Sequence, residues 1–220
     1  MRNMEIISLK KSFTVGNDSV DVLKGLSFQV DKGESLAIVG PSGCGKSTLL
    51  HILGGLGAPT SGSVQIDGAS LYDRSPSELA LYRRKEAGFV YQFYNLVPEL
   101  TAEENLLLPS LMNREKADQA YVEQILDLLG MQDRRFFYPS ELSGGQQQKI
   151  AIGRALIYHP SLLLADEPTG NLDSVKRDEV LELFSYLNKS EGMTIIMVTH
   201  DPAAAQACSR QICMLDGRQV

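Results

Sequence analysis

The sequence predicts an α/β fold in which a mostly parallel central sheet is covered by helices on both faces. Short apolar runs such as SLAIVG (35–40) are typical of strands that are buried on both faces. Stretches with helical apolar spacing, such as ADQAYVEQILDLLG (117–130), alternate with these runs along the chain. The 220 residues, 43% hydrophobic and 22% charged, suffice for one globular domain with a buried core.

The chain begins with two segments of alternating strand pattern, 4–13 and 23–30, separated by the turn-rich VGNDSV (15–20). They predict an N-terminal antiparallel β subdomain at the edge of the sheet. The later strands share the short apolar pattern, and we expect them at 35–40, 63–68, 87–92, 161–167 and 193–200. The segment 211–220 predicts a closing strand pair, and since it ends close to the last residue, whether the natural chain continues stays open.

Between residues 93 and 159 the pattern becomes helical. Thr101 and Glu104 have the spacing of a capping box, and Gly130 follows the last apolar residue of the next helical stretch. An amphipathic helix is also expected at 174–190. We therefore predict a single domain, with 1–92 and 160–220 forming the core and 93–159 forming a helical subdomain.

Composition narrows the classes of function. The formal net charge of -6 argues against a broad basic surface, so we expect no nucleic-acid partner. No apolar run approaches the roughly 18 residues that span a bilayer, and the start of the chain lacks the apolar segment of a signal peptide. We therefore expect a cytoplasmic protein. The cysteines Cys44, Cys208 and Cys213 are odd in number and lack metal-ligand spacing, so we expect free thiols.

The stretch GPSGCGKST (40–48) carries the clearest chemistry. Its Gly40, Gly45, Lys46 and Ser47 match the pattern G-x-x-x-x-G-K-[ST] between a buried strand and a helix. Glycines let successive backbone NH groups point at phosphate oxygens, the lysine reaches the outer phosphates, and the serine hydroxyl can bind magnesium. The alternative is a tight glycine turn with a chance lysine, but both flanks fit the phosphate loop. The loop predicts binding of a nucleoside triphosphate with Mg²⁺.

Cys44 lies inside this loop, where we expect it to be a small filler residue. Its place near a helix N-terminus would also make it reactive toward alkylating agents, which protection by bound nucleotide would test.

Two adjacent carboxylates follow the apolar run LLLA. Asp166 is expected to hold magnesium through water, and Glu167 to orient or deprotonate the attacking water. The alternative is a strand that ends in surface acids before Pro168. The phosphate loop favours the catalytic interpretation.

Single polar residues end two other strands. Gln92 and His200 stand where parallel strands deliver side chains into a crevice above the sheet. A glutamine can bind magnesium or fix water, and a histidine can hydrogen-bond a terminal phosphate, although each is also an ordinary residue at a strand end. We expect His51 and His159 to have no such role.

A second anion-binding helix start is expected at LSGGQ (142–146). Ser143 and Gln146 have capping-box spacing, and Gly144 and Gly145 expose backbone NH groups. About a hundred residues separate it from the phosphate loop. By local physics alone, an ordinary helix start is equally compatible with this sequence.

The motifs GPSGCGKST, Gln92, LSGGQ, LLLADE, NLDS (171–174) and His200, in this order, resemble the nucleotide-binding domains of ATP-binding cassette (ABC) transporters over essentially the whole chain. In that family two domains bind head to tail. The Ser-Gly-Gly helix start of one domain then caps the γ-phosphate that the phosphate loop of the other holds. The resemblance implies a P-loop NTPase fold and a second copy of the chain as partner.

Residue roles follow from the resemblance. It implies that Glu167 is the catalytic base and that His200 contacts the γ-phosphate. The implied magnesium contacts are Ser47, Gln92 and Asp166. The implied nucleotide contacts are Phe13, Gly40, Pro41, Ser42, Gly43, Cys44, Gly45, Lys46, Ser47, Thr48, Gln92, Ser143, Gly144, Gly145 and Gln146.

Phe13 stands where the family usually has a tyrosine that stacks on adenine, so stacking is kept and a phenolic hydrogen bond is lost. Asn171, Leu172 and Asp173 match the loop that crosses the dimer interface.

Residues 91–109 and DEPTGNLDS further resemble cassettes that power macrolide efflux, lipoprotein release, antimicrobial-peptide resistance or cell division. The resemblance implies membrane permease subunits that dock between Gln92 and Leu100. Phe93, Tyr94, Leu96 and Val97 are expected to form the groove, and Phe136, Phe137 and Tyr138 could extend the same surface; ordinary packing is the alternative for each of them.

The function that we predict is that of an ATPase subunit, peripheral on the inner face of the cell membrane, that couples MgATP binding and hydrolysis to export or mechanical work. One alternative is a soluble ABC-type ATPase that acts on DNA or the ribosome. The other is a nucleotide-dependent regulatory module. The acidic charge and the single cassette argue against the first, and the presence of Glu167 and His200 argues against the second.

Overall fold

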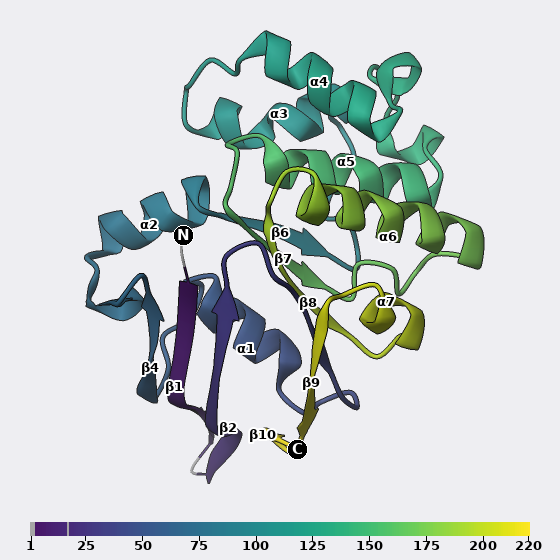
Figure 1. The fold of residues 1–220 in the computed structure, drawn as a ribbon. Coiled ribbons are helices and arrows are strands. Elements are labelled where there is room, and N and C mark those ends of the chain that lie inside the picture. The colour runs from purple at the N-terminus through teal and green to yellow at the C-terminus, as the bar shows by residue number, and fades with distance from the viewer. Residues whose placement is uncertain (1–2, 17) are drawn as a thin grey trace.

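The computed structural model describes residues 3–16 and 18–220, which form two sheets and surrounding helices (Figure 1). The smaller sheet is antiparallel, with the strand order β2-β1-β4-β5. Its strands are β1 (Asn3–Val15), β2 (Asp18–Asp31), β4 (Ser61–Ile66) and β5 (Ala69–Ser70).

The larger sheet has the strand order β10-β9-β3-β8-β7-β6 and is parallel except for its terminal strand β10. Its strands are β3 (Ser35–Val39), β6 (Ala87–Tyr91), β7 (Leu162–Asp166), β8 (Thr194–Thr199), β9 (Arg210–Leu215) and β10 (Arg218–Gln219). The predicted mostly parallel central sheet is confirmed.

Seven α-helices lie in the described part of the chain: α1 (Lys46–Leu53), α2 (Pro76–Lys85), α3 (Ala102–Met112), α4 (Gln119–Leu129), α5 (Gly144–Leu156), α6 (Ser174–Lys189) and α7 (Pro202–Gln206). Short 3₁₀ helices occupy Leu71–Asp73, Gln132–Arg134 and Pro139–Glu141. Among residues 3–16 and 18–220, no helix has the length and apolarity that crossing a bilayer requires.

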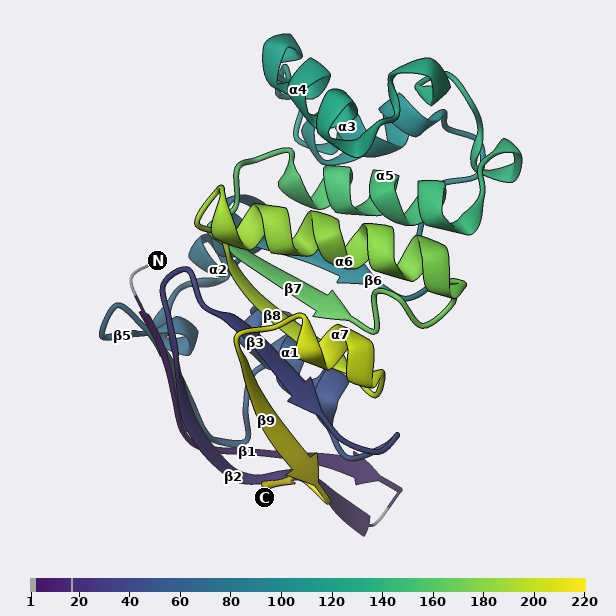
Figure 2. The same cartoon turned by 45° about the vertical axis from the view of Figure 1, so that its right-hand side comes forward.

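Both faces of the parallel sheet are buried, which explains its apolar strands. On β8, Ile196 and Val198 pack into a core shared with α1 and the antiparallel sheet. The alternate residues Ile195 and Met197 pack into a second core, shared with the helices from α3 to α6. Side chains alternate between the two faces of a strand, so a strand between two cores needs apolar residues at every position. Figure 2 shows α5 between the parallel sheet and the helices α3 and α4.

The predicted N-terminal antiparallel β subdomain is confirmed, but its place differs from the prediction. Its strands do not form an edge of the parallel sheet, because β1 is paired on both sides within its own sheet, with β2 and β4. The two sheets meet where the Lys24 backbone NH donates a 2.9 Å hydrogen bond to the carbonyl of Gly217, in the turn between β9 and β10. The expected turn at 15–20 includes residue 17, which lies outside the described residues; β1 runs to Val15 and β2 begins at Asp18.

Several predicted helix ends are confirmed. Capping boxes join Thr101 with Glu104 at α3 and Ser143 with Gln146 at α5. Gly130 ends α4 in the left-handed conformation, with φ 64°. The segment predicted as a helical subdomain, 93–159, contains α3, α4 and α5.

Two helices were missed by the sequence analysis. Helix α2 carries a readable signal, because Ser75 and Glu78 form a capping box and Pro76 occupies its first turn. Helix α7 is five residues long and begins after the N-cap residue Asp201, which is too short a segment for an apolar period.

Asn105 fixes the segment that joins β6 to α3. It is fully buried on α3, and its side-chain oxygen accepts a 2.7 Å hydrogen bond from the backbone NH of Val97. Its amide nitrogen donates to the carbonyls of Val97, Leu100 and Thr101 at 2.9 to 3.0 Å. One buried side chain therefore satisfies several backbone groups of a segment that lies outside helices and strands.

Replacing Asn105 with alanine is expected to lower the free energy of unfolding by about 2–4 kcal/mol, because buried backbone groups would lose their partners. Urea unfolding measures the change. Gln124→Ala, at an exposed position on α4, is the control and should change stability little. Equal stabilities of the two variants would contradict this role of Asn105.

Candidate functional site

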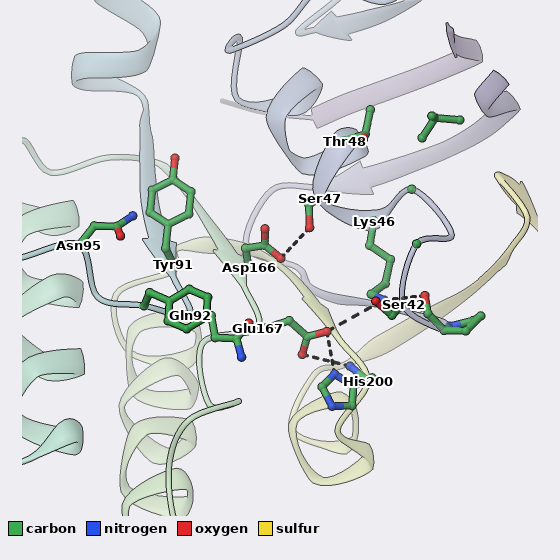
Figure 3. A pocket seen from close by; sticks show the side chains of 15 residues that line it. Ser42, Lys46, Ser47, Thr48, Tyr91, Gln92, Asn95, Asp166, Glu167 and His200 are labelled. Atoms are coloured by element: carbon green, nitrogen blue, oxygen red, sulfur yellow. Dashed lines mark hydrogen bonds and ion pairs between the residues drawn. The ribbon is translucent and has the colours of Figure 1, made fainter. Parts of the chain in front are cut away.

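A cavity of about 810 Å³ lies between the loop that precedes α1 and the C-terminal ends of β6 and β7 (Figure 3). Parallel strands that end side by side deliver their following residues into one crevice. The residues that line the cavity are Val22, Pro41, Ser42, Gly43, Gly45, Lys46, Ser47, Thr48, Tyr91, Gln92, Phe93, Asn95, Asp166, Glu167 and His200.

The loop between β3 and α1 needs its glycines. Gly45 is the N-cap of α1 and has φ 102°, a conformation that other residues rarely adopt. A Cβ atom on Gly45 would lie 2.9 Å from the Leu23 side chain, and one on Gly40 would lie 2.2 Å from the carbonyl oxygen of Met214. Close backbone packing therefore requires glycine at both positions.

Lys46 is buried, with only 7% of its surface exposed, but its ammonium group reaches the cavity. Nζ donates hydrogen bonds of 2.8 and 3.1 Å to the carbonyls of Gly40 and Pro41. It also lies 4.0 Å from Oε1 of Glu167. Nζ thus lies between the loop and the acidic end of β7, where a phosphate oxygen would replace the carbonyls as its hydrogen-bond acceptor.

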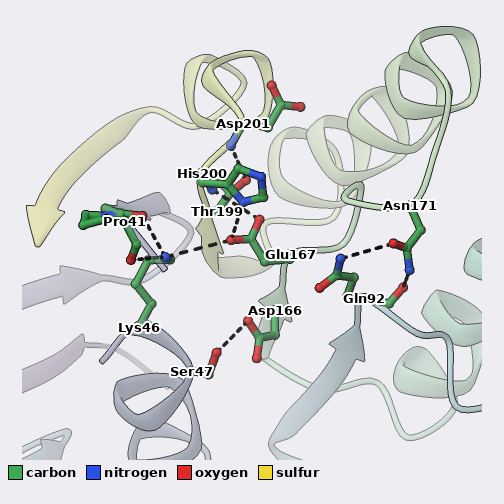
Figure 4. Close-up of polar contacts among 11 residues, drawn as sticks. Pro41, Lys46, Ser47, Gln92, Asp166, Glu167, Asn171, Thr199, His200 and Asp201 are labelled. Carbon is green, nitrogen blue, oxygen red and sulfur yellow. Dashed lines mark hydrogen bonds and ion pairs between the residues drawn. The ribbon is translucent and has the colours of Figure 1, made fainter. Parts of the chain in front are cut away.

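Ser47 and Asp166 point toward one another across the cavity, and the Ser47 hydroxyl donates a 3.1 Å hydrogen bond to Oδ1 of Asp166 (Figures 3 and 4). Burial raises the pKa of Asp166 above its ordinary value, and the hydrogen bond from Ser47 opposes this shift. Both side chains offer oxygen atoms, the ligands that Mg²⁺ prefers. Within the described ranges, no group of three or more His, Cys, Asp or Glu side chains could hold a metal ion. A cation beside these oxygens would therefore draw further ligands from phosphate or water.

Glu167 and His200 form a pair at the ends of neighbouring strands (Figure 4). Oε1 of Glu167 lies 2.9 Å from Nδ1 of His200, and Oε2 accepts a 3.2 Å hydrogen bond from the His200 backbone NH. Glu167 has φ 47°, a rare conformation for a residue with a side chain. Its own backbone NH donates to the carbonyl of Val198 at 2.9 Å, which helps to hold it in that conformation. The carboxylate is thus fixed beside Lys46 in the cavity.

Gln92 is tied to the segment after β7. Its Nε2 donates a 3.2 Å hydrogen bond to Oδ1 of Asn171, and Nδ2 of Asn171 donates to the Gln92 carbonyl at 3.0 Å. A Cβ atom on Gly170 would lie 2.8 Å from Nε2 of Gln92, so a larger residue there would displace the Gln92 amide. Farther along, Asp173 caps α6 and pairs with Lys176 at 2.8 Å.

The helix start at 143–146, expected to be a second anion site, lies outside the lining of this cavity. Ser143 is exposed and caps α5, and none of the residues 143–146 lines the cavity that the described residues form. A Cβ atom on Gly144 would lie 2.8 Å from the hydroxyl of Tyr94. The phosphate loop and this helix start are therefore separate surfaces of one chain.

Phe13 also lies outside the lining of the cavity. It is 45% exposed, and the ammonium group of Lys11 lies 5.0 Å from the centre of its ring. Its stacking on adenine stays a prediction. Val22 on β2 lines the cavity instead, and no sequence signal marked it. Tyr91 and Asn95 were missed as well, although their places beside Gln92 are a usable signal.

A glycine loop between a parallel strand and a helix, with a lysine, a hydroxyl group and two acids around one cavity, defines a P-loop nucleotide-binding domain. The family model described as ABC transporter matches residues 23–170, more than half of the chain. The chain belongs to the ABC transporter family.

Relatives support this assignment. The chain is 45% identical to the lipoprotein-releasing system ATP-binding protein LolD of Geobacter metallireducens, over 99% of this chain and 97% of the relative. It is 44% identical to the macrolide export ATP-binding/permease protein MacB of Bdellovibrio bacteriovorus, over 97% of this chain. The chain spans 33% of the length of that MacB protein. Both names match the subgroup that the sequence resembles.

Solved structures of similar fold support the same family assignment. The dimeric post-hydrolysis state of the ATP-binding cassette MJ0796, bound to ADP and Pi, has a TM-score of 0.88 and 38% identity, covering 98% of this chain and 96% of that chain. Clostridium perfringens CbiO1, part of an ABC transporter complex, has a TM-score of 0.86 and 27% identity, covering 99% and 86%. The predicted class, an ATP-hydrolysing cassette of the transporter type, is confirmed over the alternatives.

Proposed function

We propose that two copies of this chain bind MgATP head to tail and transmit the work of closing and hydrolysis to separate membrane subunits. The observation that carries the proposal is the separation of two complementary surfaces. The loop around Lys46 opens into the cavity, whereas the capped helix start at Ser143 is exposed outside it. A second copy can bring these surfaces together. The relative MJ0796, solved as a dimer with ADP and Pi, supports this arrangement.

The donor set fits a magnesium nucleotide. Ser47 and Gln92 would supply oxygen ligands to Mg²⁺, and Asp166 would hold the ion through water; when bound, Mg²⁺ neutralises charge on the phosphate oxygens. Lys46 would exchange the carbonyls of Gly40 and Pro41 for phosphate oxygens, and the backbone NH groups at the start of α1 would donate to the same phosphates.

Hydrolysis is assigned to Glu167. Its carboxylate, held by two contacts with His200, would accept a proton from the water that attacks the terminal phosphorus atom. His200 would then interact with the γ-phosphate from the end of β8. In a loose phosphoryl-transfer transition state, positioning and electrostatic stabilisation provide most of the catalysis.

Dimerisation would complete the site. The NH groups of Gly144 and Gly145 in one copy would donate to the γ-phosphate held by the other copy, and the segment 171–173 would lie at the interface. The contact of Asn171 with Gln92 supports this role, because it joins the expected interface directly to the cavity. Phosphate release by the chain with its membrane partner tests the proposal, and a complex that releases none would contradict it.

Membrane subunits are proposed to dock on the aromatic and apolar side chains of the segments 93–97 and 136–138. Phe93 is 71% exposed and Phe136 is 72% exposed, which is unusual for phenylalanine. Tyr94 and Leu96 are half-buried and contribute less surface. Lipoprotein release and macrolide export are what the names of the relatives state, and export or mechanical work of this type is proposed for this chain. The chain would then lie on the inner face of the cell membrane.

Replacing Phe136 with alanine is expected to leave ATP binding unchanged, because this residue lies outside the cavity lining, and to weaken the complex with the membrane subunit by about 10-fold or more. Pull-down with the membrane protein that co-purifies with the chain measures the loss. Tyr186→Ala, which removes a 44% exposed aromatic ring from α6, is the control. If both variants bind the membrane protein equally well, Phe136 is not part of the docking surface.

A further inference from the structure

The segment that follows Gln92 has an unusual backbone. Tyr94 and Asn95 are consecutive and both left-handed, with φ 58° and 49°. Tyr94 pays a steric cost there and Asn95 a smaller one, and two such residues in succession persist only where surrounding contacts over-determine them. Contacts from elsewhere in the chain must therefore hold this segment in place.

Arg154, near the C-terminal end of α5, supplies such contacts. Its Nη2 donates a 2.7 Å hydrogen bond to the carbonyl of Tyr94, and its Nη1 donates to the carbonyl of Asn95. Within the described part of the chain, the guanidinium forms no ion pair with a carboxylate. Burial lowers the pKa of Arg154 below its ordinary value, because the guanidinium is partly withdrawn from water. The forked donors of arginine suit two adjacent carbonyls, a geometry that lysine cannot reproduce.

Helix α5 also meets this part of the structure at other points. On β6, the strand that leads to Gln92, a Cβ atom on Gly88 would lie 2.7 Å from the carbonyl oxygen of Ala155. At the opposite end of the helix, the hydroxyl of Tyr94 lies beside Gly144. The strand, the left-handed pair and both ends of α5 thus form one packed unit.

We propose that Arg154 is a positioning residue for Gln92, acting by holding Tyr94 and Asn95 left-handed against α5. This inference rests on the role of Gln92 proposed above. Only Phe93 lies between Gln92 and Tyr94, whose carbonyl is the first of the two that Arg154 binds, so the orientation of the Gln92 amide in the cavity depends on these contacts. Because α5 begins at the Ser143 cap, the same contacts make the helix start and the Gln92 amide move together.

The test compares Arg154→Lys with Gln92→Asn in steady-state ATP hydrolysis. Lysine keeps the charge but loses the fork, so we expect kcat to fall by about 10- to 100-fold, as misplaced site groups do, with the KM for ATP changed far less. The Mg²⁺ concentration for half-maximal rate should rise in both variants. The double variant should be no worse than the poorer single variant, because both changes disable the same group.

A rescue experiment separates positioning from general damage. Glycine adopts φ 49° without steric cost, so Asn95→Gly should restore at least several-fold of the activity lost in Arg154→Lys. Arg114→Gly is the matched control, since Arg114 is also left-handed, with φ 55°, but is exposed after α3. It should restore nothing. If Arg154→Lys is too unstable for kinetics, both glycine changes are measured by thermal unfolding in Arg154→Lys and in the parent chain. Asn95→Gly should stabilise Arg154→Lys more than it stabilises the parent chain, whereas Arg114→Gly should stabilise the two equally.

The outcomes are distinguishable. Unchanged kinetics in Gln92→Asn would contradict the proposed role of Gln92 and the inference with it. If Gln92→Asn is defective in hydrolysis but Arg154→Lys is not, the role of Gln92 stands and only the positioning role of Arg154 is overturned. Multiplicative defects in the double variant, or equal rescue by Arg114→Gly, would likewise overturn it.

Discussion

Replacing Lys46 with alanine is expected to lower the affinity for MgATP by about 100-fold or more and to abolish measurable hydrolysis. The ammonium group lies at the end of a buried stem and already contacts two carbonyls of the phosphate loop. A phosphate in this cavity would lose its charge-assisted partner, and a close charge pair that is largely withdrawn from water contributes about 2–5 kcal/mol. Calorimetric titration with MgATP measures the change.

Lys149→Ala is the matched control for this prediction. Lys149 is a lysine on α5 that pairs with Glu179 at 2.8 Å, away from the cavity lining. Its removal should leave MgATP affinity within a factor of about two, because an isolated surface ion pair contributes little. Full affinity in Lys46→Ala, with the control unchanged, would contradict the assignment of the phosphate loop.

The parts of the fold that follow a local rule were predictable. Strands buried on both faces must be apolar at successive positions, so β3, β7 and β8 are visible in the sequence. Caps at Thr101 and Ser143 are equally local. The separation of the antiparallel sheet was not visible, because it depends on the pairing of β1 with the distant strand β4. The sequence pattern shows that a segment is a strand, but it does not show which other strand pairs with it.

In the candidate site, too, residues that follow a local motif were predictable and residues placed by distant segments were not. Residues that act through a fixed motif, such as Lys46 and Glu167, were predicted and lie around one cavity. Val22 reaches the cavity only because β2 passes over the loop, and an apolar residue on a strand carries no mark of that position. From the sequence alone, Arg154 is an ordinary helix residue. Its role becomes visible only when the structure shows that Tyr94 and Asn95 are left-handed and that Arg154 binds their carbonyls. Backbone conformation in a segment without helix or strand is therefore the information that the sequence lacked most.

Glu167→Gln is expected to lower the rate of hydrolysis by about 100- to 10,000-fold, the range attributed to general bases, while MgATP binding is kept. Glutamine has the same shape and can still accept a hydrogen bond from the His200 backbone NH, but it cannot take a proton from water. It also removes one negative charge next to Asp166 and close to where the triphosphate binds, so closure of the dimer should be favoured. Bound ATP should then persist between two copies.

Size-exclusion chromatography with light scattering measures this state at high protein concentration. With MgATP, Glu167→Gln should elute as a dimer, and with MgADP as a monomer, because only the triphosphate offers a γ-phosphate to the Ser143 helix start of the partner copy. Adding Ser143→Arg to Glu167→Gln is the decisive control. A bulky side chain at that cap should block the dimer and leave the phosphate loop of each chain able to bind ATP, since Ser143 lies outside the cavity. A dimer that survives this change, or a Glu167→Gln variant that stays monomeric with MgATP, would contradict the head-to-tail site.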